Sequence, residues 1–329
     1  MPVFGTFKSS KVEADKKDGV KPHIGGQAVI EGVMIRNKDI YSIAVRKPDG
    51  NIEVVKKDIN TPVKKYKILK APFIRGITAL IENLVLGIKS LLYSAQIAMP
   101  EEEESEKKRK KNEKDRSDIF IFLSMIPAII LGIVLFVVIP NLATHYIGVA
   151  EKTHPFVFHL IAGFIRLAMF ILYILAISLL KDIRRTFQYH GAEHKSIYCY
   201  EAGKPLVVEE ARKYKTLHPR CGTSFLFFVF FIAIIIFPII TVTIDTLYPD
   251  FVNFNLALRK TILILSHIII ALPIIASVSY ELLKITDKMK NAIFMKILIA
   301  PGLFLQRITT QEPTDDQLEV AIEAVKAVL

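Results

Sequence analysis

The chain has 329 residues, of which 52% are hydrophobic, and it carries a formal net charge of +11. This composition excludes an ordinary soluble enzyme unless apolar and charged residues are segregated along the chain. They are segregated, because four runs of 20 or more residues are nearly free of charge: 119–140, 156–180, 224–247 and 261–280. Each run is long enough to cross the roughly 30 Å hydrocarbon core of a bilayer. The sequence therefore predicts a membrane α-helical protein with four transmembrane helices.

The region before these runs is predicted to be β-rich. Residues 1–23 are polar and are expected to be disordered. From Ile24 to Arg36, apolar residues occupy both alternating faces, as in a strand that is covered on both sides. Two β-prone runs, 40–47 and 51–57, flank Pro48-Asp49-Gly50, which is a strong hairpin signal. Residues 24–70 are therefore expected to form a small β-rich region that contains a hairpin.

A helix is predicted next. Pro72 opens a pattern of apolar residues at steps of three and four that continues to about residue 98. Arg75, Glu82 and Lys89 make a bilayer crossing costly, so residues 71–98 are expected to form an amphipathic helix on the membrane or packed on the bundle. Residues 99–117, in which a run of acids precedes a run of bases, are expected to be a charged linker.

The distribution of Lys and Arg predicts the orientation of the four-helix domain, residues 118–283. Of the 43 basic residues, 24 precede the first span, nine lie between Lys181 and Arg220, and six follow Tyr280. The positive-inside rule therefore places both termini and the loop 181–223 in the cytoplasm. No apolar run lies near the N-terminus, so a cleaved signal peptide is not expected.

The C-terminal segment, 284–329, is expected to be a cytosolic amphipathic segment followed by a helix. Residues 292–308 are apolar but are interrupted by Lys296 and Pro301-Gly302, which fits a surface or re-entrant segment better than a crossing. Thr314 is a suitable N-cap with Gln317 three residues later, as in a capping box. The apolar face of the final helix is expected to dock on the rest of the protein: Leu318, Val320, Ala321, Ala324, Val325 and Val328.

The loop between the second and third spans carries the residues that indicate chemistry. It contains Tyr189-His-Gly-Ala-Glu-His-Lys195, in which His190 and His194 lie one helical turn apart and match the pattern H-x-x-E-H. That pattern is the inverted form of a zinc-peptidase helix, in which the Glu, here Glu193, is the general base. If the second span continues as a helix into the cytosol, Glu201 lies on the same face as the two histidines.

Three further residues extend the predicted ligand set of His190 and His194: His218, Cys221 and Glu201. Imidazole, thiolate and carboxylate together favour Zn²⁺ or another divalent transition metal. Two kinds of metal site fit: an open site in which Glu193 deprotonates a water, or a closed structural site of His190, His194, His218 and Cys221. Polar packing or lipid contact without a metal is the alternative to both.

Other polar residues are assigned more distant roles. Arg166 lies within the second span, where an ionised side chain needs a partner such as Glu281 or Asp245. Glu281 follows the fourth span and is placed to reach the motif as a ligand or as a group that supports one. Glu31 is predicted to be a buried acid on a strand that needs a partner, and it is a candidate to support the site; the alternative is an ordinary salt bridge with Arg36 or Arg75. Cys199 is expected to be a buried thiol without a partner cysteine, because the cytosol is reducing.

Three blocks of the chain resemble the YqhQ family of bacterial membrane proteins. They are Gly25-Gly-Gln-Ala-Val-Ile-Glu-Gly-Val-Met-Ile-Arg36, Tyr189-His-Gly-Ala-Glu-His-Lys195 and His218-Pro-Arg-Cys-Gly-Thr-Ser224. The tail Pro301-Gly-Leu-Phe-Leu-Gln-Arg-Ile-Thr-Thr-Gln-Glu-Pro313 is similar to the family's closing block. The resemblance implies a predicted metal-dependent enzyme of unknown function in a bacterial inner membrane. It also implies that His190, Glu193, His194, His218 and Cys221 form the site.

The leading hypothesis is therefore a metal-dependent hydrolase whose site faces the cytosol and whose substrate is a membrane-borne peptide or a lipid. The rival is a membrane scaffold that is not an enzyme. Its basic face, with net charges of +7 across residues 1–118 and +4 across 181–220, would bind anionic lipid, RNA, or a ribosome or translocon. A transporter that uses Arg166 has little support, because the sequence has no visible internal repeat.

Overall fold

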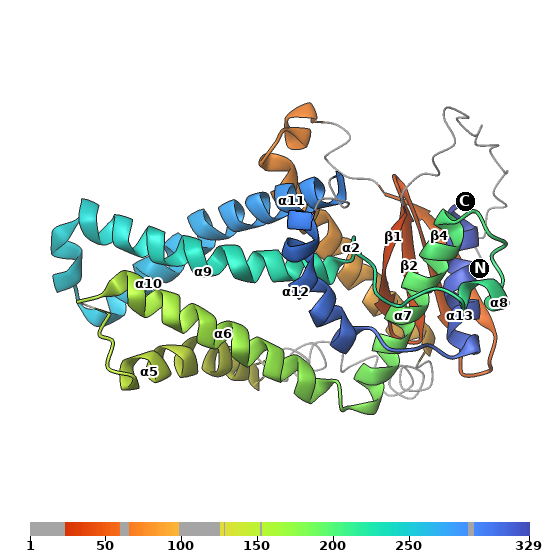
Figure 1. The fold of residues 1–329 in the computed structure, drawn as a ribbon, viewed down its shortest axis with the longest axis horizontal. Helices are drawn as coiled ribbons and strands as arrows, with labels where there is room; N and C mark the ends of the chain where they lie inside the picture. The colour runs from red at the N-terminus through yellow and green to blue at the C-terminus, as the bar shows by residue number, and fades with distance from the viewer. Residues whose placement is uncertain (1–23, 60–65, 99–125, 128, 152, 289–292) are drawn as a thin grey trace, which may run out of the picture.

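The computed structural model describes residues 24–59, 66–98, 126–127, 129–151, 153–288 and 293–329. The predictions of disorder for 1–23 and of a linker for 99–117 lie outside these residues. The described chain has two parts, a sheet covered by helices and a long helical bundle, which Figure 1 shows at opposite ends of the molecule.

The sheet has four antiparallel strands in the order β1-β2-β3-β4: β1 Gly25–Val29, β2 Gly32–Asn37, β3 Ile40–Arg46 and β4 Ile52–Asp58. The predicted hairpin between β3 and β4 is confirmed, and Gly50 there adopts a φ of +87° that other residues rarely take. The single strand predicted for 24–36 is wrong. It is two strands joined by a tight turn at Glu31, whose φ is +51°. In the sequence, the charged residue and glycine of Glu31-Gly32 mark that turn within the apolar run.

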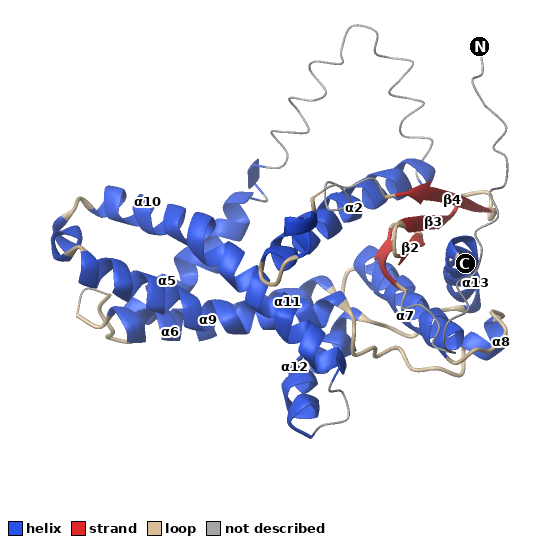
Figure 2. Cartoon of the chain, turned by 90° about the horizontal axis from the view of Figure 1, so that it is seen from above, coloured by secondary structure: helices blue, strands red, loops and turns tan. Residues whose placement is uncertain are grey.

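The sheet lies between helices on both faces (Figure 2). One face packs on α7, Lys181–Glu201, and α13, Asp315–Val328, through residues such as Val33, Ile35 and Ala44. The other face packs on α2, Ile74–Ala98, through residues such as Met34, Ile43 and Leu86. The alternation of Val33, Met34 and Ile35 between the faces follows the two-residue period of a strand.

The C-terminal helix α13 is as predicted. Thr314 and Gln317 form the capping box, and the backbone N–H of Thr314 donates to Gln317 Oε1 over 2.9 Å. The six residues of the predicted apolar face are all buried against α7 and the sheet: Leu318, Val320, Ala321, Ala324, Val325 and Val328.

The bundle contains the apolar helices. It consists of η2 Val134–Val138, α5 Ile139–Tyr146, α6 Pro155–Ile177, α9 Gly222–Leu247, η3 Pro249–Asn253, α10 Leu256–Ser266, η4 His267–Ala271 and α11 Leu272–Lys288. The turns η2 and η4 are π-helical and continue directly into α5 and α11. Helix α12, Ile293–Thr309, packs on α9 and returns the chain to the sheet. Two short helices complete the described chain: η1, Lys67–Lys70, precedes α2, and α8, Val208–Ala211, follows α7.

Within the described residues, five helices are long and apolar enough to cross a membrane, one more than the four predicted. They are 74–98, 129–146, 155–177, 222–247 and 258–286. The additional helix is α2, which the sequence reasoning set aside because of its charges. Two of its three charges are paired, since Arg75 binds Glu281 and Glu82 lies 2.7 Å from Arg36, while Lys89 is exposed. The chain is therefore a helical membrane protein in which α2 meets the length and composition of a span while also covering the sheet.

Candidate metal centre

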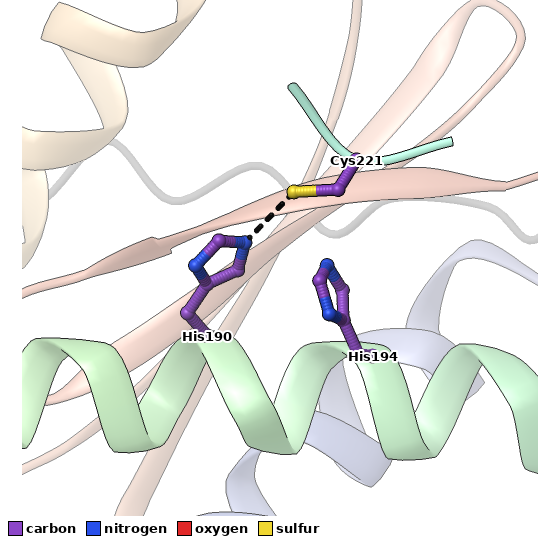
Figure 3. Close-up of side chains that lie close together, drawn as sticks. All are labelled: His190, His194 and Cys221. Carbon is purple, nitrogen blue, oxygen red and sulfur yellow. Dashed lines mark hydrogen bonds between the residues drawn. The ribbon is translucent and has the colours of Figure 1, made fainter. Parts of the chain in front are cut away.

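Helix α7 carries the His-x-x-Glu-His motif. It does not continue from α6, as the sequence reasoning assumed, because the helix breaks after Ile177 and Leu180 adopts extended backbone before α7 begins. Within α7 the four-residue spacing places His190 and His194 on one face, with ring centroids 4.6 Å apart. Figure 3 shows both rings pointing from α7 toward Cys221.

Cys221 reaches the histidines from the first turn of α9. It is the N-cap of that helix, and His190 Nε2 lies 3.1 Å from its Sγ. Ligand atoms of His190, His194 and Cys221 all lie within 4.8 Å of one another. The Cys221 sulfur also accepts from the Thr223 backbone N–H at 3.5 Å and from the Thr223 hydroxyl at 3.2 Å. Such donors at a helix N-terminus suit a sulfur that carries negative charge.

Backbone carbonyls orient both imidazole rings. Nδ1 of His190 lies 2.8 Å from the Thr309 carbonyl oxygen, and Nδ1 of His194 contacts the carbonyl oxygen of Thr216. A carbonyl can only accept, so each Nδ1 carries the proton and each Nε2 is left with a lone pair. Burial lowers the pKa of His194, which keeps that ring neutral. Metal-binding histidines are commonly held in this way, with the second ring nitrogen bound to a carbonyl group.

Glu193 is buried beside the cluster. Its side chain is almost fully enclosed, and burial raises its pKa, while a hydrogen bond from the backbone of Gly26 opposes that rise. Oε2 lies 4.0 Å from His190 Nε2, and no donor in the described part of the chain is within hydrogen-bond distance of it. A buried carboxylate oxygen without a partner is costly, by about 1–3 kcal/mol, so it requires a function or a ligand.

Two glycines permit this arrangement. A Cβ on Gly26 would lie 2.2 Å from the Met34 carbonyl oxygen and 3.2 Å from Glu193 Oε1, so glycine lets β1 approach α7. A Cβ on Gly191 would lie 2.0 Å from the Gln311 carbonyl oxygen. The segment that crosses α7 there is tied by a hydrogen bond from the Gln311 N–H to the Phe187 carbonyl, and it includes Thr309. Gly191 therefore does not argue against a metal-binding helix, although it lowers helix propensity.

His218 and Glu201 lie next to the cluster but are turned to other partners. His218 Nδ1 accepts from the Arg220 backbone N–H at 3.3 Å, and its Nε2 lies 3.8 Å from Glu201 Oε2. Glu201 forms an ion pair with Arg220. Neither belongs to the group of atoms within 4.8 Å that His190, His194 and Cys221 form. The open arrangement of three donors thus fits the geometry better than a closed site that includes His218.

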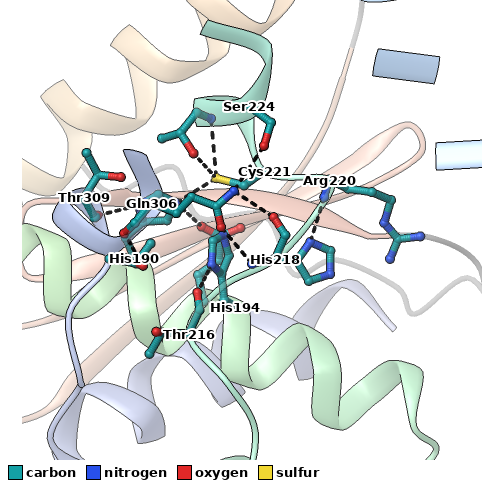
Figure 4. Close-up of polar contacts among 12 residues, drawn as sticks. His190, His194, Thr216, His218, Arg220, Cys221, Ser224, Gln306 and Thr309 are labelled. Atoms are coloured by element: carbon teal, nitrogen blue, oxygen red, sulfur yellow. Dashed lines mark hydrogen bonds and ion pairs between the residues drawn. The ribbon is translucent and has the colours of Figure 1, made fainter. Parts of the chain in front are cut away.

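Gln306 was not identified from the sequence, although it holds the loop that carries Cys221. It is fully buried in α12, its Oε1 accepts from the His218 backbone N–H at 2.8 Å, and its Nε2 donates to the His218 carbonyl at 2.8 Å and to Ser224 Oγ at 3.2 Å (Figure 4). The signal available in the sequence was an amide within the apolar run 292–308. Its partner could not be inferred, because 88 residues separate Gln306 from His218.

The remaining predicted site residues lie elsewhere. Glu281 pairs with Arg75 and not with the motif. Glu31 lies in the β1–β2 turn and binds Arg185, with Nη2 and Oε2 2.6 Å apart, instead of the predicted Arg36 or Arg75. It also accepts from the Tyr189 hydroxyl at 3.2 Å, which connects it to the motif helix. Arg166 donates to the Phe136 carbonyl, 2.7 Å away, and not to Glu281 or Asp245.

The donor set fits a transition metal. Tetrahedral zinc has nitrogen ligands at about 2.0–2.1 Å and sulfur at about 2.3 Å, so its ligand atoms are separated by roughly 3.3–3.6 Å. Ligand atoms of the three donors all lie within 4.8 Å of one another, His190 Nε2 and Cys221 Sγ are 3.1 Å apart, and each histidine presents a lone pair. Glu193 Oε2, which has no hydrogen-bond partner among the described residues, lies 4.0 Å from His190 Nε2. Two histidines and one thiolate favour zinc over magnesium or calcium.

Comparison with known proteins places the chain. Residues 71–329 match the model of a family described as "Protein of unknown function (DUF1385)". The chain is 34% identical over 323 residues to the "Uncharacterized protein YqhQ" of Bacillus subtilis (strain 168). The aligned region spans 95% of this chain and 94% of that protein. The chain belongs to this family. The resemblance seen in the sequence is therefore confirmed, and no solved structure matches the chain.

Proposed function

We propose that this protein is a metal-dependent hydrolase of the cytoplasmic face of a bacterial inner membrane. In this proposal His190, His194 and Cys221 hold Zn²⁺, and Glu193 is the general base. The observation that carries it is the buried Glu193 Oε2, which has no hydrogen-bond partner among the described residues and lies 4.0 Å from a ring nitrogen of the three-donor cluster. A purely structural site does not need such a group.

The chemistry follows from the positions of these side chains. A divalent metal held by the three donors supplies Lewis acidity, which makes water a nucleophile near neutral pH. Glu193 takes a proton from the attacking water as the new bond to the scissile carbonyl or phosphoryl forms. The same carboxyl then returns that proton to the leaving group as the scissile bond breaks. Burial raises the pKa of Glu193 toward the operating pH, which suits a group that both accepts and donates a proton.

The location of the cluster supports a substrate at the membrane. Cys221 immediately precedes α9, which has the length and composition of a membrane span, so the cluster adjoins the end of that helix. A membrane-borne peptide or a lipid is the proposed substrate class. The cytoplasmic orientation rests on the excess of Lys and Arg before the first span and between Lys181 and Arg220.

The experiment is elemental analysis of the protein purified in detergent, followed by an activity screen. Wild type is expected to hold about one zinc per chain, and the His190→Ala, His194→Ala double variant is expected to hold none. His154→Ala, an exposed histidine in the loop before α6, is the matched control and should keep the metal. Glu193→Gln should keep the metal and lose turnover of membrane peptides or phospholipid vesicles.

Two results would contradict the proposal. If wild type contains no metal, the proposed metal centre is ruled out. Salt-sensitive co-sedimentation with ribosomes would then favour the scaffold. Full turnover in Glu193→Gln would leave the metal site standing but would refute the role of Glu193 as base.

A further inference from the structure

A second polar site lies within the bundle, away from the metal centre. A cavity of about 720 Å³ is lined by residues of η2, α5, α6, α9, α10 and η4. Figure 1 shows α5 and α10 at the end of the bundle remote from α7. Both π-helical turns contribute to the lining, with Phe136 from η2 and His267 from η4. Such turns are frequent at functional sites.

Arg166 supplies positive charge to this cavity. Its Nε donates to the Phe136 carbonyl, 2.7 Å away, which uses one of the five guanidinium N–H groups. Among the described residues, no carboxylate forms an ion pair with Arg166. Glu151, which also lines the cavity, lies 3.7 Å from Arg259, and Asp245 lies 3.2 Å from the same guanidinium. An arginine within a membrane span is costly without an anion, so the cavity favours a negatively charged ligand.

Three buried polar atoms at the cavity have no hydrogen-bond partner in the described part of the chain: Asn141 Oδ1, His159 Nε2 and His267 Nε2. Of these, His159 Nε2 faces Glu151 Oε1 at 3.6 Å and is paired with that carboxylate, which leaves Asn141 Oδ1 and His267 Nε2 without a partner among the described residues. The other ring nitrogen of His267 forms a hydrogen bond with the Phe237 backbone. In the neutral ring, Nε2 is therefore the acceptor. Asn141 Oδ1 is also an acceptor, and O–H or N–H donors of a ligand would satisfy both atoms.

The rest of the wall is apolar. Phe158, Leu263 and Ile268 line it, and the volume lies within the range of about 300–1,000 Å³ that is typical of small-molecule sites. An apolar wall with a few convergent polar groups suits an amphiphile, because the chain of the ligand covers the wall while its headgroup meets the polar atoms. Lys260 adds a second cation to the lining.

We propose that this cavity binds an anionic amphiphile whose headgroup also carries hydroxyl groups. Its anionic oxygens bind the free N–H groups of Arg166, its hydroxyls donate to Asn141 and His267, and its hydrocarbon chain lies along the apolar wall. This site is independent of the metal centre and requires no zinc.

The test uses native mass spectrometry of the full chain in a neutral detergent, with three probes. The probes are 1-palmitoyl lysophosphatidylglycerol, the zwitterionic 1-palmitoyl lysophosphatidylcholine, and glycerol 3-phosphate, which has the anion and hydroxyls but no chain. Wild type should bind one lysophosphatidylglycerol at least about 10-fold more tightly than either other probe, the loss expected when a charge-assisted hydrogen bond or the chain contacts are missing.

Variants locate the binding. Arg166→Gln should weaken lysophosphatidylglycerol binding about 10-fold or more, and Arg166→Lys, which keeps the charge, should retain most of it. Arg184→Gln, which removes an exposed cation of α7 outside the cavity, should bind like wild type.

The proposal is overturned by equal affinity for the two lysolipids, because recognition would then ignore charge. It is also overturned by glycerol 3-phosphate binding as tightly as the lysolipid, because the ligand would then be a free phosphate ester. Since both comparisons use wild-type protein, a folding defect in Arg166→Gln does not prevent a decision. Unchanged binding in a folded Arg166→Gln variant would likewise refute the assigned contact.

Discussion

Gly191→Ala tests whether the geometry of the metal centre depends on the segment that crosses α7. An added Cβ would lie 2.0 Å from the Gln311 carbonyl oxygen, and ordinary contact begins near 3.4 Å, so that backbone must move by more than 1 Å. Intrinsic helix propensity predicts the opposite effect, a gain of about 1 kcal/mol, because alanine is a better helix former than glycine.

The structural costs exceed that gain. Overpacking a tight contact costs about 1–3 kcal/mol, and loss of the hydrogen bond from the Gln311 N–H to the Phe187 carbonyl costs about 0.5–1.5 kcal/mol. The expected net result is a destabilisation of about 0.5–3.5 kcal/mol. Because Thr309 lies two residues before Gln311 and orients His190, zinc affinity should also fall, by about 10- to 100-fold.

Thermal unfolding in detergent measures the first effect, and competition with a zinc chelator measures the second. Gly132→Ala is the matched control, because that helical glycine has open space around its Cβ position. Its replacement should leave zinc affinity unchanged and should show only the stability gain of about 1 kcal/mol that helix propensity predicts. If Gly191→Ala is as stable as wild type and binds zinc equally well, the crossing segment does not hold His190, and the reasoning is refuted.

Three further perturbations address the base, the loop and the C-terminal helix. Burial raises the pKa of Glu193 above 4.5 in the folded protein. The protonated carboxyl therefore favours folding below pH 4.5, and this contribution to stability is lost as pH rises through the folded pKa. In chelator-treated protein, the melting temperature of Glu193→Gln relative to wild type should therefore increase with pH. Gln306→Leu strands the His218 backbone groups and should cost about 2 kcal/mol or more in thermal unfolding, and an unchanged melting temperature would contradict that role. Thr314→Ala should cost about 1 kcal/mol in the same assay, whereas Thr314→Ser, which keeps the cap, should cost little.

Much of the fold could be predicted because its signals are local. The apolar runs, the turn at Gly50 and the capping box at Thr314 each depend on residues within a few positions of one another. Two local predictions failed for physical reasons. The run 24–36 is apolar on both sides of Glu31-Gly32, so its alternation predicted one strand although that charged residue and glycine mark a turn. The number of apolar helices differs because α2 has the length and composition of a span despite its charges, and the pairing of Arg75 with Glu281 could not be seen in the sequence.

The candidate ligands of the site were also predicted from the sequence, but which of them come together was not. The sequence by itself determined the four-residue spacing of His190 and His194, the acid between them and the nearby Cys221. Only the tertiary structure decided that Cys221, and not His218 or Glu201, completes the cluster. The reason is that ring orientation depends on carbonyls far along the chain: Thr309, which is 119 residues from His190, fixes which nitrogen of that ring faces the cluster. Periodicity within a helix carries no information about such contacts.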